Sequence, residues 1–326
     1  MKEILMLIKK RLYIFVIVDM ILALIIGSLI DFSSFNIKPV SMIAVFMMLY
    51  PMLTGLAVEK VKKAGRNYKL IITTLIFAYV IASFSAYIIS RTILSDYPDI
   101  AFAMIMVGAI PCSNMLIGWS GIADASVEDA LVIAVIGLLL IPVISPVILK
   151  ISGGVFVTFN VLKLFYTLMI FILVPLILGY VTRRLIIARK GQNYFMKIKK
   201  VFPGVSASGI LVIVFFSVAK VANKVIDNPQ IFLIILVGLM IYYIIQTLIS
   251  ILASKLFNFK YEQAMILILG ATASSQAISL SVAASMFPDM TVFALSFKPA
   301  IQVLYIMLLI YGMGPWLKKF LKQNRG

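Results

Sequence analysis

Two runs of polar and small residues interrupt apolar stretches of this sequence, and they hold most of the side chains that could bind a ligand. The first run is Gly108–Asn114, with Pro111 near its centre, and the second is Gly270–Ala277. Proline inside a helix removes a backbone hydrogen bond, and small residues let two backbones approach closely. The oxygen, nitrogen and sulfur atoms of such breaks can bind a small solute. The candidate ligand-binding residues in the two runs are Cys112, Ser113, Asn114, Ser274, Ser275 and Gln276.

Two ionisable residues fall well inside apolar stretches, where a charge is costly and usually functional. Asp19 lies near the middle of the first stretch, and Lys298 precedes Pro299 in the last one. Both are candidates for handling a coupling ion. The alternatives are that they form a structural pair, or that Lys298 extends toward the membrane surface. The residues expected to break helices are Pro111, Gly270 and Pro299.

The elements that position these residues are identified by composition as membrane helices. Of the 326 residues, 63% are hydrophobic and 13% are charged, with a mean hydropathy of +1.12. A soluble domain carries about 25% charged residues, and a membrane-spanning helix needs about 20 apolar ones. We therefore predict an all-α integral membrane protein. Its ten expected spans are 12–31, 38–58, 69–90, 98–118, 129–150, 160–182, 203–222, 230–253, 262–285 and 291–313.

Several classes of function are excluded by the same composition. There is no histidine, which removes imidazole metal sites and proton relays, and one cysteine cannot form an internal disulfide. A phosphate-binding loop of the GxxxxGK[ST] kind is absent. The net charge of +17 comes from basic residues at the ends of apolar stretches, so we expect no nucleic-acid partner. We expect no cofactor and no metal site, although the methionines of 38–58 leave a copper(I) path as an alternative to ordinary packing.

Basic residues fall mainly on one side of the predicted spans. Of the 29 Lys and Arg, 22 lie on the side of both termini and six on the opposite side. Because basic loops stay in the cytoplasm, we expect a multi-pass protein of the cell membrane with both termini cytoplasmic. The connection 151–159 separates a first five-helix repeat at 1–150 from a second at 160–313. A basic cytoplasmic tail follows at 314–326.

An odd number of helices in each half makes the two repeats inverted, and the two polar runs fall at matching positions, in the fourth helix of each half. In carriers with inverted repeats, discontinuous helices form the substrate site near the membrane midplane. We therefore expect a carrier of a small solute, with its fourth and ninth helices discontinuous. A channel is an alternative, as is a non-transporting sensor or enzyme. We expect no enzyme, because the chain offers no catalytic constellation.

Four motifs, in order along the chain, resemble the arsenite efflux permeases of the bile acid/arsenite/riboflavin transporter superfamily. Tyr50-Pro51-Met52 resembles the motif of helix two, and Pro111–Met115 followed by Gly118-Trp119 resembles the cysteine segment of helix four. Pro175–Arg183 is similar to the PLxxGxxTR helix end, and Ala271–Gln276 resembles the helix-nine crossover. The resemblance implies ten helices in a bile acid:sodium symporter-like fold. It also implies that helices four and nine unwind where they cross, and that transport proceeds by alternating access.

Arsenite efflux is the function that this resemblance implies. In the permeases the helix-four cysteine is expected to meet the metalloid, and Cys112 matches it. One reversible bond between arsenic(III) and a thiol suits transport, whereas two or three thiols would hold arsenic too tightly. Ser113, Asn114 and Gln276 would line the path. The expected partners are membrane lipid and this small-molecule substrate, and the oligomeric state is left open.

The chain departs from the family's pattern where the permeases carry carboxylates. Ser279 and Gln302 stand in place of glutamates of helices nine and ten, and Lys298 replaces a glycine. In the bile-acid branch, Gln276 would match a sodium-site glutamine, but Thr272 falls where that branch has a glutamate. The coupling ion, proton or sodium, is therefore open. Gln302 joins the candidate ligand-binding residues by its position.

An organic anion is the alternative substrate. A lysine ammonium can stand where a sodium ion would lie, or can attract an anion directly, and helix N-termini add partial positive charge. The alternative function is thus an ion-coupled carrier of an organic anion, with Lys298 near the site. Cys112 would then be a small apolar filler.

Overall fold

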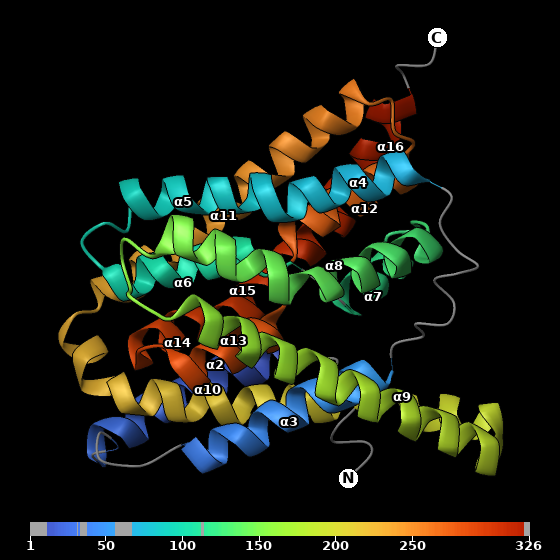
Figure 1. Ribbon diagram of the computed structural model, residues 1–326. Coiled ribbons are helices and arrows are strands. Elements are labelled where there is room, and N and C mark those ends of the chain that lie inside the picture. The colour runs from blue at the N-terminus through green and yellow to red at the C-terminus, as the bar shows by residue number, and fades with distance from the viewer. Residues whose placement is uncertain (1–11, 31, 33–37, 56–66, 112–113, 323–326) are drawn as a thin grey trace. The chain divides into compact units, whose positions relative to one another are not determined.

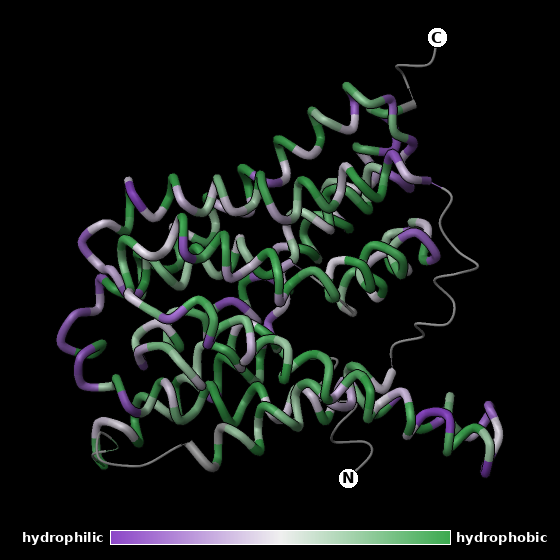
Figure 2. Tube along the Cα trace, viewed as in Figure 1, coloured by the Kyte–Doolittle hydropathy of each residue, from purple (hydrophilic) through white to green (hydrophobic). Residues whose placement is uncertain are grey.

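The computed structural model describes residues 12–30, 32, 38–55, 67–111 and 114–322 (Figure 1). Within these ranges the regular structure is helical, apart from one isolated antiparallel bridge. Seven helices in the same ranges are long and apolar enough to cross a membrane, and three shorter ones are also apolar. Hydrophobic residues run along most of their length, and hydrophilic residues gather at helix ends and connections (Figure 2). The prediction of an all-α, multi-pass membrane protein is confirmed.

The chain divides into two compact units, and each unit draws on both halves of the sequence. Unit 1 contains described residues of 12–55, 162–235 and 276–300. In it, α10 packs against α2, α3, α13 and α14, and α13 packs against α3. The helices wholly in unit 1 are α2 (Leu12–Leu29), α3 (Lys38–Thr54), α10 (Phe202–Asp227), α13 (Gln276–Met286) and α14 (Asp289–Ser296).

Glycines allow the helices of unit 1 to approach closely. A Cβ atom at Gly27 of α2 would lie 2.4 Å from the carbonyl oxygen of Ala219 on α10. At Gly209 of α10 it would lie 2.7 Å from the carbonyl oxygen of Ala44 on α3. Close backbone approach through small residues is the usual means of packing helices in a membrane, where lipid is as apolar as the side chains.

Unit 2 contains described residues of 67–161, 236–275 and 301–322. Here α5 packs against α6, α7 against α8, and α12 against both α4 and α7. Its first elements are α4 (Tyr68–Ile76), the π-helix η2 (Phe77–Ile81), α5 (Ala82–Thr92), α6 (Pro98–Ala109), α7 (Asn114–Ile122), α8 (Val127–Ile148) and the π-helix η3 (Leu149–Gly153). Its later elements are α12 (Tyr261–Thr272), the π-helix η4 (Leu309–Met313) and α16 (Gly314–Lys322).

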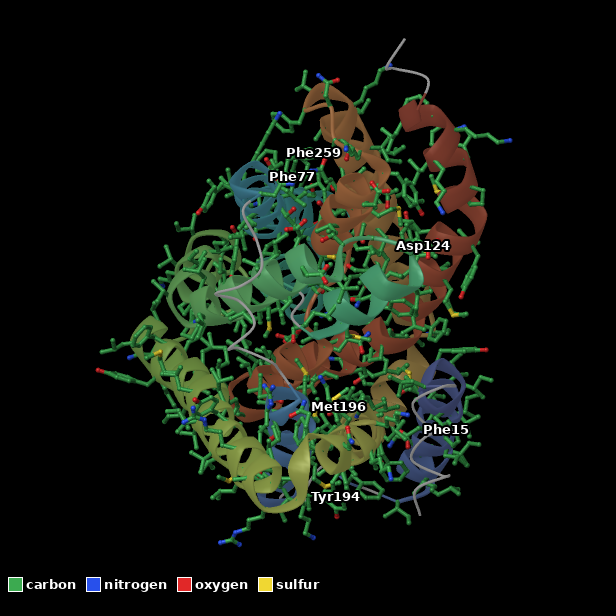
Figure 3. The ribbon with its side chains drawn as sticks, turned by 90° about the vertical axis from the view of Figure 1, so that its right-hand side faces the viewer. Phe15, Phe77, Asp124, Tyr194, Met196 and Phe259 are labelled. Atoms are coloured by element: carbon green, nitrogen blue, oxygen red, sulfur yellow. The ribbon has the colours of Figure 1, made fainter. Side chains whose placement is uncertain are left out.

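Figure 3 shows Asp124 between α7 and α8, where its carboxylate accepts a 3.2 Å hydrogen bond from Lys318 of α16.

Three further helices carry the chain from one unit into the other. They are α9 (Val161–Lys199), α11 (Gln230–Leu256) and α15 (Lys298–Leu308). The predicted break in the fourth span is confirmed by the gap between α6 and α7, and the break in the ninth by the gap between α12 and α13. The division into inverted repeats at 1–150 and 160–313 stays a prediction.

The predicted sixth span, 160–182, ends too early. Helix α9 continues to Lys199, so the basic residues assigned to a connection lie largely on a helix. Gly191, with φ 80° and ψ 162°, interrupts it, and such a positive φ favours glycine. Tyr194 and Met196, labelled in Figure 3, lie beyond this kink. The helical spacing of apolar residues continues after Thr182. A span that is assigned from its average hydropathy does not detect this continuation. Residues 314–322 of the predicted tail are likewise helical, as α16.

Candidate solute-binding crossover

The two helix breaks of unit 2 meet each other. Helix α6 is followed by Ile110, whose backbone is extended, and α12 is followed by Ala273, which is also extended. The Ser275 amide donates a hydrogen bond to the Ile110 carbonyl oxygen at 3.1 Å, and Pro111 and Ser274 form an antiparallel bridge. Backbone groups released by a broken helix must find partners inside protein when water is absent. At this crossover, an amide of one break satisfies a carbonyl oxygen of the other, which meets part of that requirement.

Gln302 of α15 completes the crossover with its side-chain amide. Its Oε1 accepts a hydrogen bond from the Ser274 amide at 3.3 Å, and its Nε2 donates to the Ser274 carbonyl oxygen at 3.4 Å. The Tyr243 hydroxyl of α11 donates to the same Oε1 at 3.5 Å. All three residues are buried. The predicted ligand-binding residue Gln302 therefore contacts the backbone of the break directly.

A second layer of side chains supports these contacts. The Tyr305 hydroxyl donates to the Tyr243 carbonyl oxygen at 3.0 Å and shares a 2.7 Å hydrogen bond with the Thr247 hydroxyl. On the other break, the Ser145 hydroxyl of α8 donates to the Ala109 carbonyl oxygen at 2.6 Å. Sequence reasoning missed these four residues. Ser145 could have been noticed because it lies beside Pro146 in the fifth span. The sequence around the two tyrosines does not distinguish them from other residues of an apolar span.

Gly270 does not break its helix, contrary to expectation. Helix α12 continues to Thr272, so the break begins three residues after the glycine. The reason for glycine here is space, since a Cβ atom would lie 2.4 Å from Cγ2 of Thr74 on α4. Gly108 has the same role on α6, where a Cβ atom would lie 2.6 Å from the Ala82 carbonyl oxygen.

Among the described residues of the two breaks, one side-chain hydroxyl is buried without a hydrogen-bond partner. It is the hydroxyl of Ser274. Buried polar atoms are almost always paired with protein or with ordered water, so this hydroxyl has the capacity to bind a water molecule or a polar solute. Cys112 and Ser113 lie outside the described residues, as does the side chain of Asn114, so their predicted roles stay predictions.

Other predicted residues belong to unit 1. Lys298 is 1% exposed, and its Nζ donates a 2.9 Å hydrogen bond to the Ser279 hydroxyl of α13. Pro299 follows it at the start of α15, where α14 and α15 are separated by Phe297. Gln276, the first residue of α13, is buried and its Nε2 has no hydrogen-bond partner.

Asp19 is half-buried in α2, and its Oδ2 atom is buried without a hydrogen-bond partner. The structural pair between Asp19 and Lys298 is therefore not formed through that oxygen.

The groups that the structure describes at the crossover are uncharged. Its contacts come from backbone amides and carbonyls, one carboxamide and several hydroxyls. Within the described residues there is no group of three or more His, Cys, Asp or Glu that could hold a metal ion. Such a centre can bind a small polar solute through dipoles.

Broken helices that meet inside an all-α membrane bundle define a class of membrane protein in which unwound backbone forms the ligand site. Comparison with known protein families narrows this class to one family. The profile of the Sodium Bile acid symporter family matches residues 42–228, more than half of the chain. The chain belongs to this family.

Two curated relatives carry the same name. The chain is 27% identical over 214 residues to the arsenical-resistance protein Acr3 of Alkaliphilus metalliredigens, which covers 61% of this chain. It is 20% identical over 288 residues to the arsenical-resistance protein Acr3 of Corynebacterium glutamicum, covering 83% of this chain and 77% of the relative. The chain spans 59% of the length of the Alkaliphilus relative.

Proposed function

We propose that this protein is a secondary transporter of the cell membrane that exports arsenite by alternating access. The observation that carries the proposal is the meeting of the two helix breaks, with the Ser275 amide 3.1 Å from the Ile110 carbonyl oxygen. Cys112 follows Ile110 by two positions in the sequence. The names of the two Acr3 relatives supply the substrate class.

Arsenite suits a neutral crossover because arsenous acid is uncharged at neutral pH. Dipoles such as the Gln302 amide and the Ser274 hydroxyl can bind its hydroxyl groups without the cost of desolvating a charge. In our proposal the Cys112 thiol then replaces one arsenic hydroxyl, forming one As–S bond and releasing one water molecule. The reverse reaction, in which water attacks arsenic and the thiol leaves, releases the cargo. A single As–S bond keeps this exchange reversible.

The orientation belongs to the same proposal. Both termini would lie in the cytoplasm, because the basic residues are concentrated on their side of the spans. Arsenite would thus enter the crossover from the cytoplasm and leave on the opposite side. A coupling ion, proton or sodium, would drive export.

The test is arsenite accumulation in everted membrane vesicles under an imposed proton or sodium gradient. We expect the unaltered chain to accumulate arsenite and Cys112→Ser to lose accumulation, because an alcohol does not form the As–S bond. Ser28→Ala, which removes an exposed hydroxyl, is the control and should transport normally. Equal accumulation by Cys112→Ser and the unaltered chain would exclude the thiol as the metalloid contact.

A second candidate is an ion-coupled carrier of an organic anion, and the buried amine of Lys298 favours it. In this case Cys112 only fills space. The distinguishing experiment is taurocholate uptake by the same vesicles. Uptake that is lost in Lys298→Met and kept in Cys112→Ser would establish this alternative. Absence of taurocholate uptake alongside arsenite accumulation would remove it.

A further inference from the structure

The last part of α9, together with the residue that follows it, forms a strongly basic segment, 183–200, which the proposed transport mechanism leaves unexplained. The segment contains seven Lys and Arg and no Asp or Glu. Five of its basic side chains are exposed, namely Arg184, Arg189, Lys190, Lys197 and Lys200. Like charges at this density repel one another, so an anionic partner would stabilise them.

The basic segment lies beyond the part of α9 that crosses the membrane. Helix α9 has 39 residues, whereas the hydrocarbon layer is about 30 Å thick and is crossed by about 20 residues at 1.5 Å each. A helix that enters the hydrocarbon at Val161 has therefore left it near about residue 180. The basic segment begins three residues later, at the level where the phosphate groups of lipids lie.

Exposed apolar side chains are interspersed among the basic ones. Leu185, Tyr194 and Met196 are 51%, 41% and 48% exposed, and Figure 3 labels the last two on the part of α9 beyond the kink. The Nζ atom of Lys190 lies 4.8 Å from the ring centroid of Tyr194. A helix at the membrane surface has this composition, because its apolar groups reach the acyl chains while its basic groups meet the phosphates. A soluble acidic partner would match the charge and leave the apolar side chains in water.

One buried side chain holds the part of α9 beyond the kink in place. Phe195 is 1% exposed, and its ring packs edge-on against Phe202 of α10 with 6.1 Å between the ring centroids. The guanidinium carbon of Arg183 lies 5.5 Å from the centroid of the same ring. All three residues belong to unit 1. Because adjacent residues of a helix point about 100° apart, the neighbours of Phe195 on either side lie on other faces.

We propose that the basic segment 183–200 is a binding site for anionic phospholipids. Its exposed Lys and Arg bind the phosphate groups of the lipids, while Leu185, Tyr194 and Met196 enter the boundary between headgroups and acyl chains. Charge identifies the ligand, because a cluster of basic residues directly beside a membrane span is attracted to anionic lipids and a zwitterionic lipid has no net charge. The inference concerns how α9 attaches to the membrane, and it holds whatever solute the protein carries.

The experiment measures how deeply residue 193 lies in two kinds of vesicle. The full chain carries Cys112→Ser, which removes the single cysteine, and Asn193→Cys, an exposed position to which a nitroxide spin label is attached. The ratio of its collisions with oxygen, which concentrates in the bilayer, to those with a water-soluble nickel chelate reports depth. We expect this ratio to be at least about threefold higher in phosphatidylglycerol mixed with phosphatidylcholine than in phosphatidylcholine alone. High salt should abolish the difference, because it screens the attraction.

A variant with three basic residues of the segment replaced tests the charge directly. The replacements are Arg189→Gln, Lys190→Gln and Lys197→Gln. Each basic residue near an anionic surface changes the attachment equilibrium about fivefold, so the three together should lower it about a hundredfold and remove the difference between the vesicles. A matched control has the same net charge but loses three exposed lysines elsewhere, and it should keep the difference. Its replacements are Lys150→Gln, Lys224→Gln and Lys260→Gln.

Four results would overturn the inference. A label exposed to nickel in both kinds of vesicle, in protein whose thermal unfolding is unchanged, would favour a soluble acidic partner. A label equally deep in both would mean that apolar contacts alone attach the segment. Equal losses in the two triple variants would mean that total charge, and not this segment, attracts the lipid. Suppression of the difference by dissolved glycerol phosphate would mean that the segment binds free phosphate groups. Because the assay contains no arsenite, none of these results bears on the proposed transport.

Discussion

The crossover of unit 2 and the Lys298 contact of unit 1 are two buried polar regions built on opposite principles. The crossover joins two helix breaks through backbone groups and the neutral amide of Gln302. The other region has a single amine bonded to the Ser279 hydroxyl. The contacts of the first region come from neutral dipoles, and the second region contains a buried amine.

This difference separates two tasks that any coupled carrier performs. A site of neutral dipoles binds an uncharged solute and gives it no preference for one protonation state of the protein. A buried amine binds a proton and offers little to an uncharged solute. Variants of the two regions should therefore fail in different ways.

The largest effect is expected from Gln302→Leu. The substitution leaves the buried amide and carbonyl of Ser274 without their partner, and each unsatisfied group costs about 1–3 kcal/mol. We expect a loss of about 3–4 kcal/mol in the free energy of unfolding, together with loss of arsenite counterflow. Thermal unfolding in detergent and counterflow in proteoliposomes measure the two. Gln192→Leu, at an exposed position, is the control, and equal behaviour of the two variants would show that the Gln302 contacts do not hold the crossover together.

A smaller effect is expected from Gly270→Ala, because the new Cβ atom would lie 2.4 Å from Cγ2 of Thr74. Overpacking of this kind costs about 1–3 kcal/mol. Thr74→Ser removes the clashing methyl group, so the double variant should recover most of the lost stability. Gly118→Ala should be neutral, because among the described residues no atom beyond its own helix backbone and chain neighbours lies within 4 Å of the new Cβ. A double variant no more stable than Gly270→Ala would contradict the close packing of α12 on α4.

The smallest effect concerns the ion pair between Lys220 and Asp289 in unit 1. Its side chains are 15% and 46% exposed, and an ion pair with one solvent-facing partner contributes about 0–1 kcal/mol. Asp289→Asn should therefore shift stability by less than about 1 kcal/mol and leave transport unchanged. The measurement is thermal unfolding at low and high salt. A loss of stability comparable to that of Gln302→Leu would contradict this prediction. It would show that the ion pair stabilises unit 1 more than a solvent-facing pair is expected to.

The sequence alone was sufficient to predict which spans are interrupted, although it placed the break of the ninth span at Gly270, three residues too early. Pro111 lacks the backbone donor that a helix needs, and the run Gly270–Ala277 combines small size with competing polar groups, so both interruptions were predictable. Lys298 was recognised for the same kind of reason, since an amine in an apolar stretch is costly. All these signals are local.

The partners of these residues could not be predicted, because they depend on contacts between distant parts of the chain. Gln302 bonds to Ser274, 28 positions away, and nothing in either neighbourhood specifies that contact. Gly270 was expected to end a helix, yet it makes room for Thr74 on another one. Glycine serves both purposes, and only the packing distinguishes them.

The most direct test of the central claim uses the fact that Cys112 is the single cysteine of the chain. Any thiol labelling of the purified protein reports on this residue, and Cys112→Ser supplies the blank. We predict that arsenite at about ten times its dissociation constant slows maleimide labelling about tenfold, while arsenate has no effect. A labelling rate that arsenite leaves unchanged, in protein that is folded and labels readily, would contradict the claim that Cys112 meets the metalloid at the crossover.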